Sequence, residues 1–260
     1  MENSIIIQTK QLSIGYTIKN IQNCIAQNLN LNFQKGKLIT LIGANGVGKS
    51  TLLKTLTSIQ KPLYGEVILN NLNIHQYTDL ELAKNLSVVL TEKLPPSNLT
   101  IYELVALGRQ PYTNWLGTLT EEDHTKIKEA LILTEITSIQ HKKHYEISDG
   151  QLQKALIARA LAQDTSLIIL DEPTTHLDLH HKVSVFKLLK KLAHENQKCI
   201  LFSTHDLDLA IQISDEMVVM TPDFIIQNEP CLLIEKGIFN LLFKDHDITF
   251  DNEKGKFIFS

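Results

Sequence analysis

The chain has 260 residues, of which 43% are hydrophobic and 21% are charged, and its formal net charge at pH 7 is -4. This is ordinary globular usage, which argues against a disordered chain or a fibrous repeat. Because Lys and Arg are mixed with Asp and Glu throughout, we expect no basic face for a phosphate backbone and no nucleic-acid partner.

The N-terminal segment and the apolar runs of the chain do not predict passage through a membrane. The first ten residues, MENSIIIQTK, lack the basic region and the long apolar stretch of a secretory signal. No apolar run exceeds four residues, whereas a membrane-spanning helix needs about 20. If a membrane is involved, another polypeptide is expected to cross it.

Residues 37–42, with sequence KLITLI, form a short apolar run with β-branched members, which predicts a buried strand. A glycine-rich turn follows. Between Leu52 and Pro62, apolar residues recur at helical spacing, which predicts a helix. Strand, loop and helix therefore follow one another in this part of the chain.

The turn, residues 43–50 with sequence GANGVGKS, fits the phosphate-binding loop pattern in the strand–loop–helix context that this motif requires. Glycines let backbone N–H groups point at phosphate oxygens, and the helix N-terminus adds positive potential. We expect Lys49 near the β- and γ-phosphates and the Ser50 hydroxyl on Mg²⁺. The alternative, a glycine-rich turn without a ligand, is disfavoured by the strand and helix on either side.

Further short strands are expected at residues 67–69, 88–90, 166–170, 199–202 and 217–220. Strands that alternate with helices predict a mostly parallel sheet with both faces covered.

Two segments differ from this alternation. Residues from about 92 to 150 read as helix-like stretches without a strand, which we interpret as a helical insertion within a domain formed by residues 1–220. Residues 221–260 mix short apolar runs with polar residues, and we interpret them as a small C-terminal appendage.

Two adjacent carboxylates, Asp171 and Glu172, follow the strand at residues 166–170. They stand at the carboxyl edge of the sheet, where ligands of α/β proteins bind. Asp171 is expected to hold the Mg²⁺ shell. Because side chains alternate along a strand, Glu172 can instead orient a water for attack on the γ-phosphate. An acidic pair that only caps the loop is the alternative.

Residues 147–151, with sequence ISDGQ, precede a helix-patterned segment and resemble the LSGGQ signature of ATP-binding-cassette (ABC) proteins. Tyr16, the stretch TTHLD that ends at Asp178, and the stretch STH that ends at His205 are similar in order and spacing to the family's aromatic A-loop, D-loop and switch histidine. The resemblance covers residues 1 to about 220. It implies an α/β P-loop NTPase fold with a mostly parallel central sheet, an N-terminal antiparallel β part and an inserted helical subdomain.

The resemblance also implies an ATP hydrolase in which two copies of the chain sandwich ATP and Mg²⁺. Tyr16 would stack on adenine, while Ser148 and the amide of Gly150 would close over the γ-phosphate bound to the second copy. Glu172 and His205 would be the catalytic residues. The residues implied to bind ATP are Tyr16, Gly43, Ala44, Asn45, Gly46, Val47, Gly48, Lys49, Ser50, Thr51, Ser148, Gly150, Gln151 and Asp178. The residues implied to bind Mg²⁺ are Ser50, Asp171 and Thr91.

Two positions depart from the family pattern. Where the family usually has a Gln, this chain has Thr91, whose hydroxyl can ligate Mg²⁺ but reaches less far, so either Glu92 substitutes or nucleotide sensing is altered. Asp149 replaces the first glycine of the signature. Because a carboxylate close to a triphosphate is repelled, we expect Asp149 to face away from it and to favour the helix start.

Histidines and cysteines were also weighed as candidate ligands. Two histidine groups, His141 with His144 and His176 with His180 and His181, lack an accompanying Cys and are interpreted as solvated rather than zinc-binding. The three cysteines, Cys24, Cys199 and Cys231, include no C-x-x-C pair and are expected to be reduced, buried thiols in a cytosolic setting.

Residues 100–112, 119–123 and 172–179 resemble the corresponding stretches of the import ATPases for iron siderophores, haem and cobalamin. The implied assembly has two copies of this chain beneath two permease transmembrane subunits, with a substrate-binding protein that delivers the solute. The chain would then be peripheral, on the cytoplasmic face of the inner (plasma) membrane. A soluble cassette ATPase such as an iron–sulfur assembly component, an importer ATPase for another solute, and a non-hydrolysing regulatory module are the alternatives. Glu172 and His205 speak against the last.

Overall fold

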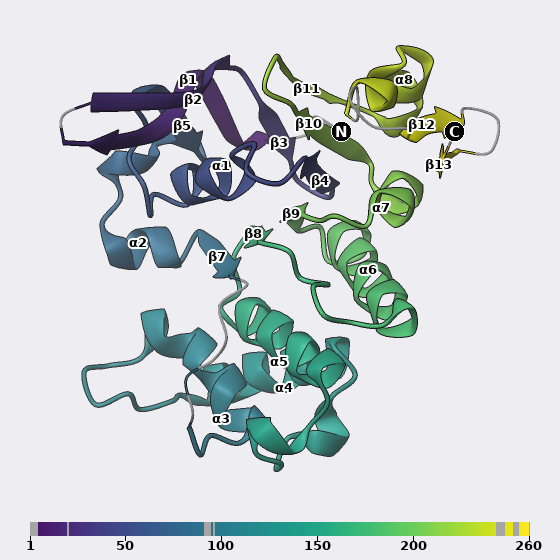
Figure 1. Cartoon of the computed structure of the whole chain (residues 1–260). Coiled ribbons are helices and arrows are strands. Elements are labelled where there is room, and N and C mark those ends of the chain that lie inside the picture. The colour runs from purple at the N-terminus through teal and green to yellow at the C-terminus, as the bar shows by residue number, and fades with distance from the viewer. Residues whose placement is uncertain are drawn as a thin grey trace.

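The computed structural model describes residues 5–19, 21–90, 95, 97–242, 248–251 and 255–259. Figure 1 shows an antiparallel sheet at the top, a central sheet beneath it, and a helical part at the bottom. The α-helices of the described residues are α1 (Lys49–Leu56), α2 (Asp79–Ala83), α3 (Ile101–Ala106), α4 (Glu121–Leu133), α5 (Asp149–Ala162), α6 (Leu179–His194), α7 (Leu207–Ile213) and α8 (Pro230–Glu235). None of them is both long and apolar enough to cross a bilayer.

The central sheet has six strands in the order β11-β10-β4-β9-β8-β7. Four of its neighbouring pairs are parallel, and only β10 and β11 pair antiparallel. This confirms the expected mostly parallel sheet. Its strands are β4 (Leu38–Gly43), β7 (Leu86–Val89), β8 (Leu167–Leu170), β9 (Cys199–Ser203), β10 (Glu216–Met220) and β11 (Ile225–Asn228).

The central strands are apolar at nearly every position because both faces of the sheet are covered. Every residue of β4, β8 and β9 is buried. Side chains alternate between the faces: Ile39 and Leu41 of β4 belong to a core shared with α1 and the antiparallel sheet, whereas Leu38 belongs to a core shared with helices α3 to α6. The sheet therefore separates two hydrophobic cores.

The antiparallel sheet lies over α1 and has the order β2-β1-β5-β6, with β3 paired to β1. Its strands are β1 (Ile5–Ile18), β2 (Ile21–Leu29), β3 (Asn32–Gln34), β5 (Tyr64–Leu69) and β6 (Leu72–Asn73). The N-terminal antiparallel part that the family resemblance implies is thus present.

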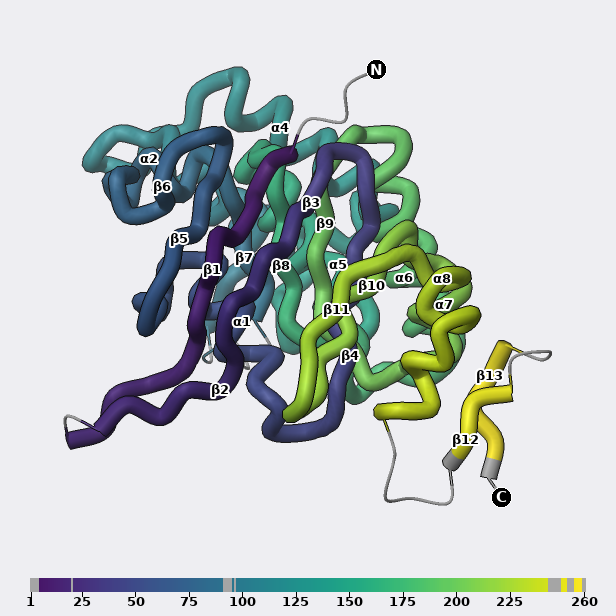
Figure 2. Tube along the Cα trace, turned by 90° about the horizontal axis from the view of Figure 1, so that it is seen from above, coloured from purple at the N-terminus to yellow at the C-terminus, as the bar shows by residue number. Residues whose placement is uncertain are grey.

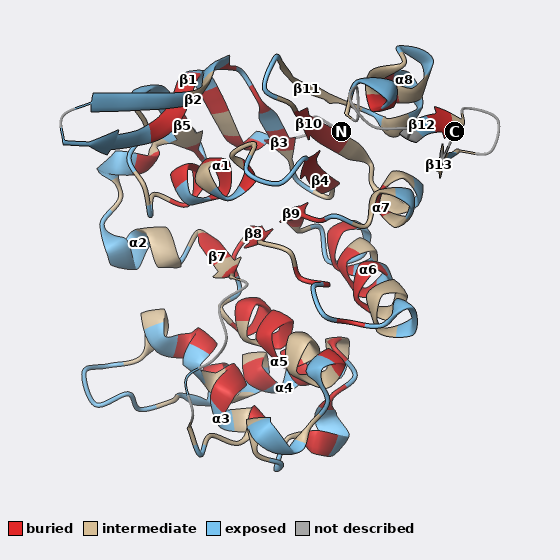
Figure 3. Cartoon of the chain, in the orientation of Figure 1, coloured by how far each residue is buried: buried red, intermediate tan, exposed pale blue. Residues whose placement is uncertain are grey.

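The segment between β7 and β8 is helical, as expected. In addition to α3, α4 and α5 it contains the 3₁₀ turns η2 (Leu107–Tyr112), η3 (Thr137–Ile139) and η4 (His144–Glu146). Figure 3 shows buried stretches in α3, α4 and α5, and their buried residues belong to the core beneath the central sheet. The remaining 3₁₀ turns are η1 (Ile74–Gln76) and η5 (Ile238–Leu241).

The C-terminal segment begins by extending the central sheet, since β11 pairs with β10. After α8 and η5, strands β12 (Ile248–Asp251) and β13 (Lys256–Phe259) form a separate hairpin at the edge of the molecule (Figure 2). Phe239, Phe250 and Phe257 pack their rings together, and the Phe257 N–H donates to Asp208 Oδ1 of α7 at 3.2 Å. A third core therefore joins this segment to α7 and β10.

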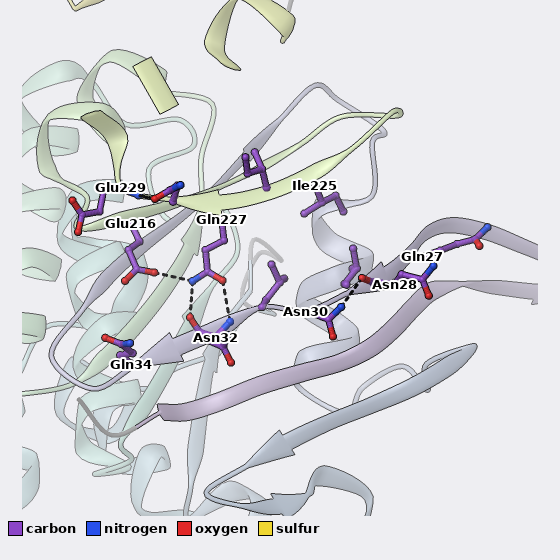
Figure 4. Close-up of a pocket in the computed structure, with 13 residues that line it drawn as sticks. Gln27, Asn28, Asn30, Asn32, Gln34, Glu216, Ile225, Gln227 and Glu229 are labelled. Carbon is purple, nitrogen blue, oxygen red and sulfur yellow. Dashed lines mark hydrogen bonds between the residues drawn. The ribbon is translucent and has the colours of Figure 1, made fainter. Parts of the chain in front are cut away.

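A polar hollow of about 510 Å³ separates β2 and β3 from β10 and β11. Gln227 of β11 bridges it: its Oε1 accepts from the Asn32 N–H at 2.9 Å, and its Nε2 donates to Glu216 Oε2 at 2.8 Å (Figure 4). The same Nε2 donates to the Asn32 carbonyl. One amide side chain thus joins the edge of the antiparallel sheet to the central sheet.

Two expectations differ from the structure. The helix expected up to Pro62 ends at Leu56, because Ser58 adopts a left-handed backbone conformation (φ 61°); Ile59 lies beyond it and is 58% exposed. The expectation that the cysteines are buried is correct for Cys199, and burial raises the pKa of its thiol. It is wrong for Cys24 and Cys231, which are exposed in the structure.

Candidate functional site

The predicted phosphate-binding loop joins β4 to α1. Gly46 and Gly48 have φ values of 76° and 110°, in the region that glycine adopts without strain. Gly48 is also the N-cap of α1, and a Cβ there would lie 2.9 Å from Met220 Cε of β10. Glycine is therefore favoured at Gly48 by its backbone conformation, and a larger residue would also displace the side chains of Ile25 and Met220.

Lys49, the first residue of α1, folds its side chain back into the loop. Its Nζ donates to the carbonyls of Gly43 at 2.9 Å and Ala44 at 3.2 Å, and the residue is 6% exposed. Burial lowers the pKa of the ammonium, while the charges of Glu172 and Asp171 oppose that shift. Lys49 thus connects the loop electrostatically with the carboxylates at the end of β8.

Ser50 and Asp171 line the same small cavity, about 10 Å³ in volume, between α1 and β8. Asp171 Oδ1 accepts a hydrogen bond from Ser203 Oγ at 2.6 Å, which fixes the orientation of the carboxylate. A hydroxyl and a carboxylate are oxygen ligands of the kind that Mg²⁺ prefers. The donor set therefore fits the expected metal; Thr91 and Glu92 lie outside the described residues.

Glu172 and His205 are 33 positions apart and meet because β8 and β9 are adjacent parallel strands. Glu172 Oε1 lies 2.7 Å from His205 Nε2, and Glu172 Oε2 accepts from Thr175 Oγ1 at 3.0 Å. The Glu172 backbone is in the left-handed region (φ 48°), and its N–H donates to Ser203 Oγ at 2.9 Å. A non-glycine residue there is strained, and such strain persists where the surroundings hold it.

A second carboxylate, Asp206, holds the loop that carries His205. Its Oδ2 accepts from Thr174 Oγ1 at 2.9 Å, and its Oδ1 accepts from Lys182 Nζ of α6 at 2.6 Å. Asp206, Ser203 and Lys182 were not among the site residues predicted from the sequence. The contacts of Ser203 and Asp206 depend on the parallel pairing of β8 with β9, which places the ends of both strands side by side.

Tyr16 lies on β1 opposite Asn23 of β2 and is 42% exposed. Its hydroxyl accepts from Asn23 Nδ2 at 2.6 Å. The same strand β2 reaches the phosphate-binding loop, because Ile25 is the nearest neighbour of the position that a Gly48 Cβ would occupy. The antiparallel sheet therefore presents an exposed aromatic ring from strands that contact the loop.

The predicted signature segment begins α5. The Ser148 Oγ accepts from the Gln151 N–H at 3.3 Å, and Gln151 Oε1 accepts from the Ser148 N–H at 3.1 Å, which is a capping box. Asp149 is exposed in the first turn, where a negative charge favours the helix start. α5 and α1 belong to different cores, on opposite faces of the central sheet.

Asp178 caps the N-terminus of α6. Its Oδ1 accepts from the His181 N–H at 2.9 Å and lies 2.8 Å from His181 Nδ1. Hydrogen bonds from His181 lower the pKa of Asp178. Within the described part of the chain, no group of three or more His, Cys, Asp or Glu side chains is placed to hold a metal ion.

Together, the phosphate-binding loop, the carboxylates that follow β8 and the histidine that follows β9 define a nucleotide hydrolase of the P-loop class. The sequence profile of the ABC transporter family matches residues 26–175. The chain belongs to this family, and it is an ATP-hydrolysing subunit of an ABC transporter.

Curated relatives cover most of the chain. An uncharacterized ABC transporter ATP-binding protein from Methanocaldococcus jannaschii is 42% identical over 83% of this chain and 73% of its own length. The iron(3+)-hydroxamate import ATP-binding protein FhuC from Bacillus subtilis is 38% identical over 96% and 92%. The achromobactin transport ATP-binding protein CbrD from Dickeya dadantii is 38% identical over 91% and 87%.

Solved structures agree with the fold. The dimeric structure of the bacterial ABC transporter cassette MJ0796 is 28% identical, with a TM-score of 0.73, over 86% of this chain and 98% of that one. CbiO1 from Clostridium perfringens, part of the transporter complex cbiONQ, is 26% identical, with a TM-score of 0.78, over 94% and 96%. A post-hydrolysis state of MJ0796 contains ADP and phosphate. These findings confirm the expected fold class.

Proposed function

We propose that this chain powers the uptake of a metal chelate, with a ferric siderophore as the first candidate and haem or cobalamin as the others. ATP hydrolysis by this chain is supported by one observation above all: Glu172 is paired with His205 and lies close enough to Lys49 of the phosphate-binding loop to affect its pKa. The solute class is supported by the iron-hydroxamate and achromobactin relatives, which align over most of both chains.

We assign the chemistry to residues as follows. Glu172 accepts the proton of the attacking water, and His205 holds the Glu172 carboxylate and contacts the γ-phosphate. Lys49 and the N–H groups of the loop bind the β- and γ-phosphates. Ser50, Asp171 and Thr91 hold Mg²⁺, which when bound neutralises charge on the phosphates. Tyr16 stacks on adenine.

Two copies complete each site in this proposal. Because α5 and α1 lie on opposite faces of the sheet, the signature residues Ser148, Gly150 and Gln151 are assigned to ATP bound by the other copy. The dimeric cassette relative supports this arrangement. Asp178, at the exposed start of α6, is assigned to the same contact between copies.

We further propose that residues 1–220 form the ATPase domain, that its helical insertion at about 92–150 docks on a permease, and that residues 221–260 are a C-terminal appendage. The permease would hold the chain at the cytoplasmic face of the membrane, and a separate binding protein would deliver the solute. The insertion suits this role because it is a compact helical unit continuous with the core beneath the sheet.

ATP turnover tests the catalytic assignment. Because a positioned base contributes about 10²–10⁴-fold to rate, Glu172→Gln is expected to lower kcat by at least about 100-fold while it still binds ATP. Lys49→Ala is expected to lose nucleotide affinity instead. Equal rates in the parent protein and in Glu172→Gln would contradict the assignment.

Uptake tests the solute class. The chain, its genomically adjacent permease and the cognate binding protein are reconstituted in vesicles, and labelled ferric siderophore is competed with unlabelled siderophore, haem and cobalamin. We expect ATP-dependent uptake that only one chelate class suppresses. Active ATPase without uptake of any of the three would exclude the proposed solutes.

A further inference from the structure

The first turn of α6 lies against the first turn of α5, and one imidazole occupies the space between them. His181 Nδ1 lies 2.8 Å from Asp178 Oδ1, and the His181 N–H donates to the same oxygen at 2.9 Å. These two contacts fix the ring relative to the cap of α6.

The opposite part of the ring faces Gly150. A Cβ built on Gly150 would lie 2.8 Å from His181 Cγ and 3.0 Å from His181 Nε2, which is closer than real Cβ contacts. The imidazole therefore fills the volume that a side chain at Gly150 would need. Gly150 is buried although Ser148 and Asp149, which precede it, are exposed.

We propose that His181 is a positioning residue that holds the signature segment, residues 148–150, at a fixed place relative to Asp178 within one copy of the chain. This inference rests on the proposed function, in which both groups face the partner copy. A small misplacement of a group that contacts a reacting phosphate can cost about 100-fold in rate. A rigid ring between the two helix starts limits such misplacement.

The two contacts of His181 can be separated chemically. His181→Asn places an amide N–H near the position of Nδ1 and keeps the Asp178 hydrogen bond, but it leaves the space beside Gly150 empty. His181→Phe fills that space and keeps the backbone N–H bond to Asp178, but its ring cannot hydrogen-bond to that carboxylate. Lys187→Ala is the matched control, because Lys187 is exposed on the same helix, whereas the exposed His180 packs its ring edge-on against that of His181.

Pairing of two copies is the direct measurement. Each variant is made in the Glu172→Gln background, and the ATP concentration that gives half-maximal dimer is measured by size-exclusion chromatography with light scattering. For His181→Asn we expect about a tenfold increase, or about 1.4 kcal/mol, with the affinity for a fluorescent ATP analogue within about twofold of the parent. His181→Phe is expected to be less affected, and Lys187→Ala unaffected.

A second measurement tests the contact between the ring and Gly150 itself. Gly150→Ala forces a methyl group into the imidazole, and His181→Ala in the same chain removes the obstacle. If the ring and Gly150 are in contact, the double variant pairs better than Gly150→Ala alone, because the two changes are coupled rather than additive.

The outcomes separate this inference from the proposed function. If Glu172→Gln without any change at His181 does not form dimers in the presence of ATP, the two-copy assignment fails, and the result does not bear on His181. If Glu172→Gln pairs normally and both His181 variants change pairing by less than about threefold, the positioning role is wrong. An equal loss of ATP affinity by each variant would mark His181 as merely structural and would also overturn it.

Discussion

At the scale of single residues, the site depends on side chains that hold other side chains. Ser203 Oγ donates to the Asp171 carboxylate and accepts from the backbone N–H of Glu172, so one hydroxyl joins the side chain of Asp171 to the backbone of Glu172. Sequence reasoning assigned the carboxylates from their place after a strand, and their roles stay predictions. It could not select Ser203, because that choice requires the register between β8 and β9, which no local pattern encodes.

Asp206 offers a test of such indirect positioning. Asp206→Asn keeps an oxygen for Thr174 but loses the charge that pairs with Lys182, so the loop that carries His205 should loosen. We expect kcat to fall about tenfold, since misplaced catalytic groups are costly, with little change in ATP affinity. Steady-state ATPase kinetics and equilibrium ATP binding check this.

Asp208→Asn is the control. Asp208 lies in α7, two positions after Asp206, and the variant retains a side-chain oxygen that can accept from the Phe257 N–H. A fall in kcat as large in Asp208→Asn as in Asp206→Asn would show that the loss is not specific to the His205 loop.

At the scale of elements, one local sequence signal, the capping box, marks four of the eight described α-helix starts. Capping boxes begin α2, α3, α4 and α5, and such a box joins a Ser or Thr to an acidic or amide side chain three positions later. The end of α1 was placed too late, because an apolar period continues past Leu56 although Ser58 turns left-handed. Helix ends depend on single backbone conformations, which a periodic pattern does not report.

A buried ion pair fastens the helical part. Arg109 Nε of η2 lies 2.6 Å from Asp123 Oδ1 of α4, and the two side chains are 3% and 2% exposed. Arg109 Nη1 also donates to the Ala162 carbonyl of α5 at 2.9 Å. Asp123→Asn leaves the guanidinium without its counter-charge in a dry environment. We expect the free energy of unfolding to fall by about 3–5 kcal/mol, as urea denaturation would measure.

The double variant Arg109→Met with Asp123→Asn removes both charges while an amide oxygen still accepts from the Thr120 N–H, and it is expected to be more stable than Asp123→Asn alone. If it is the less stable of the two, the uncompensated charge is not the cause.

The same carboxyl predicts the response of stability to acid. Burial alone would raise the pKa of Asp123, but hydrogen bonds from Thr120 and Arg109 outweigh it, and the folded pKa is lowered. A group with a depressed folded pKa stabilises above its unfolded pKa of about 3.9 and loses that contribution as pH falls through the folded value. Below about pH 4, the parent should therefore lose stability more steeply than Asp123→Asn. Parallel pH dependences would contradict this.

At the scale of the whole molecule, the central sheet keeps the phosphate-binding loop and the signature helix in separate cores. Alternating strands and helices predicted the sheet, because a fully covered parallel sheet leaves a clear apolar pattern. The link between the two sheets through Gln227 and Asn32, 195 positions apart, had no such signal. Contacts of this kind follow from the assembled fold, whereas the proposed need for a second copy was already implied by the family resemblance.

Mixed dimers test that need directly. Lys49→Ala disables the loop of its own copy, and Ser148→Arg places a bulky cation in the signature segment that should serve the other copy. In a dimer of either variant alone, both sites would carry one defect, so each variant is expected to hydrolyse ATP slowly. In a mixed dimer, one site carries both defects and the other pairs an intact Lys49 with an intact Ser148.

Random mixing of equal amounts makes about half of the dimers mixed, so one working site in each predicts about a quarter of the parent ATPase rate if the sites act independently. The activity should rise on mixing and reach its maximum near an equimolar ratio. If hydrolysis requires two intact sites, mixing restores nothing while mixed dimers still form. If Ser148→Arg alone keeps the parent rate, the signature segment does not close the site, and the two-copy assignment fails.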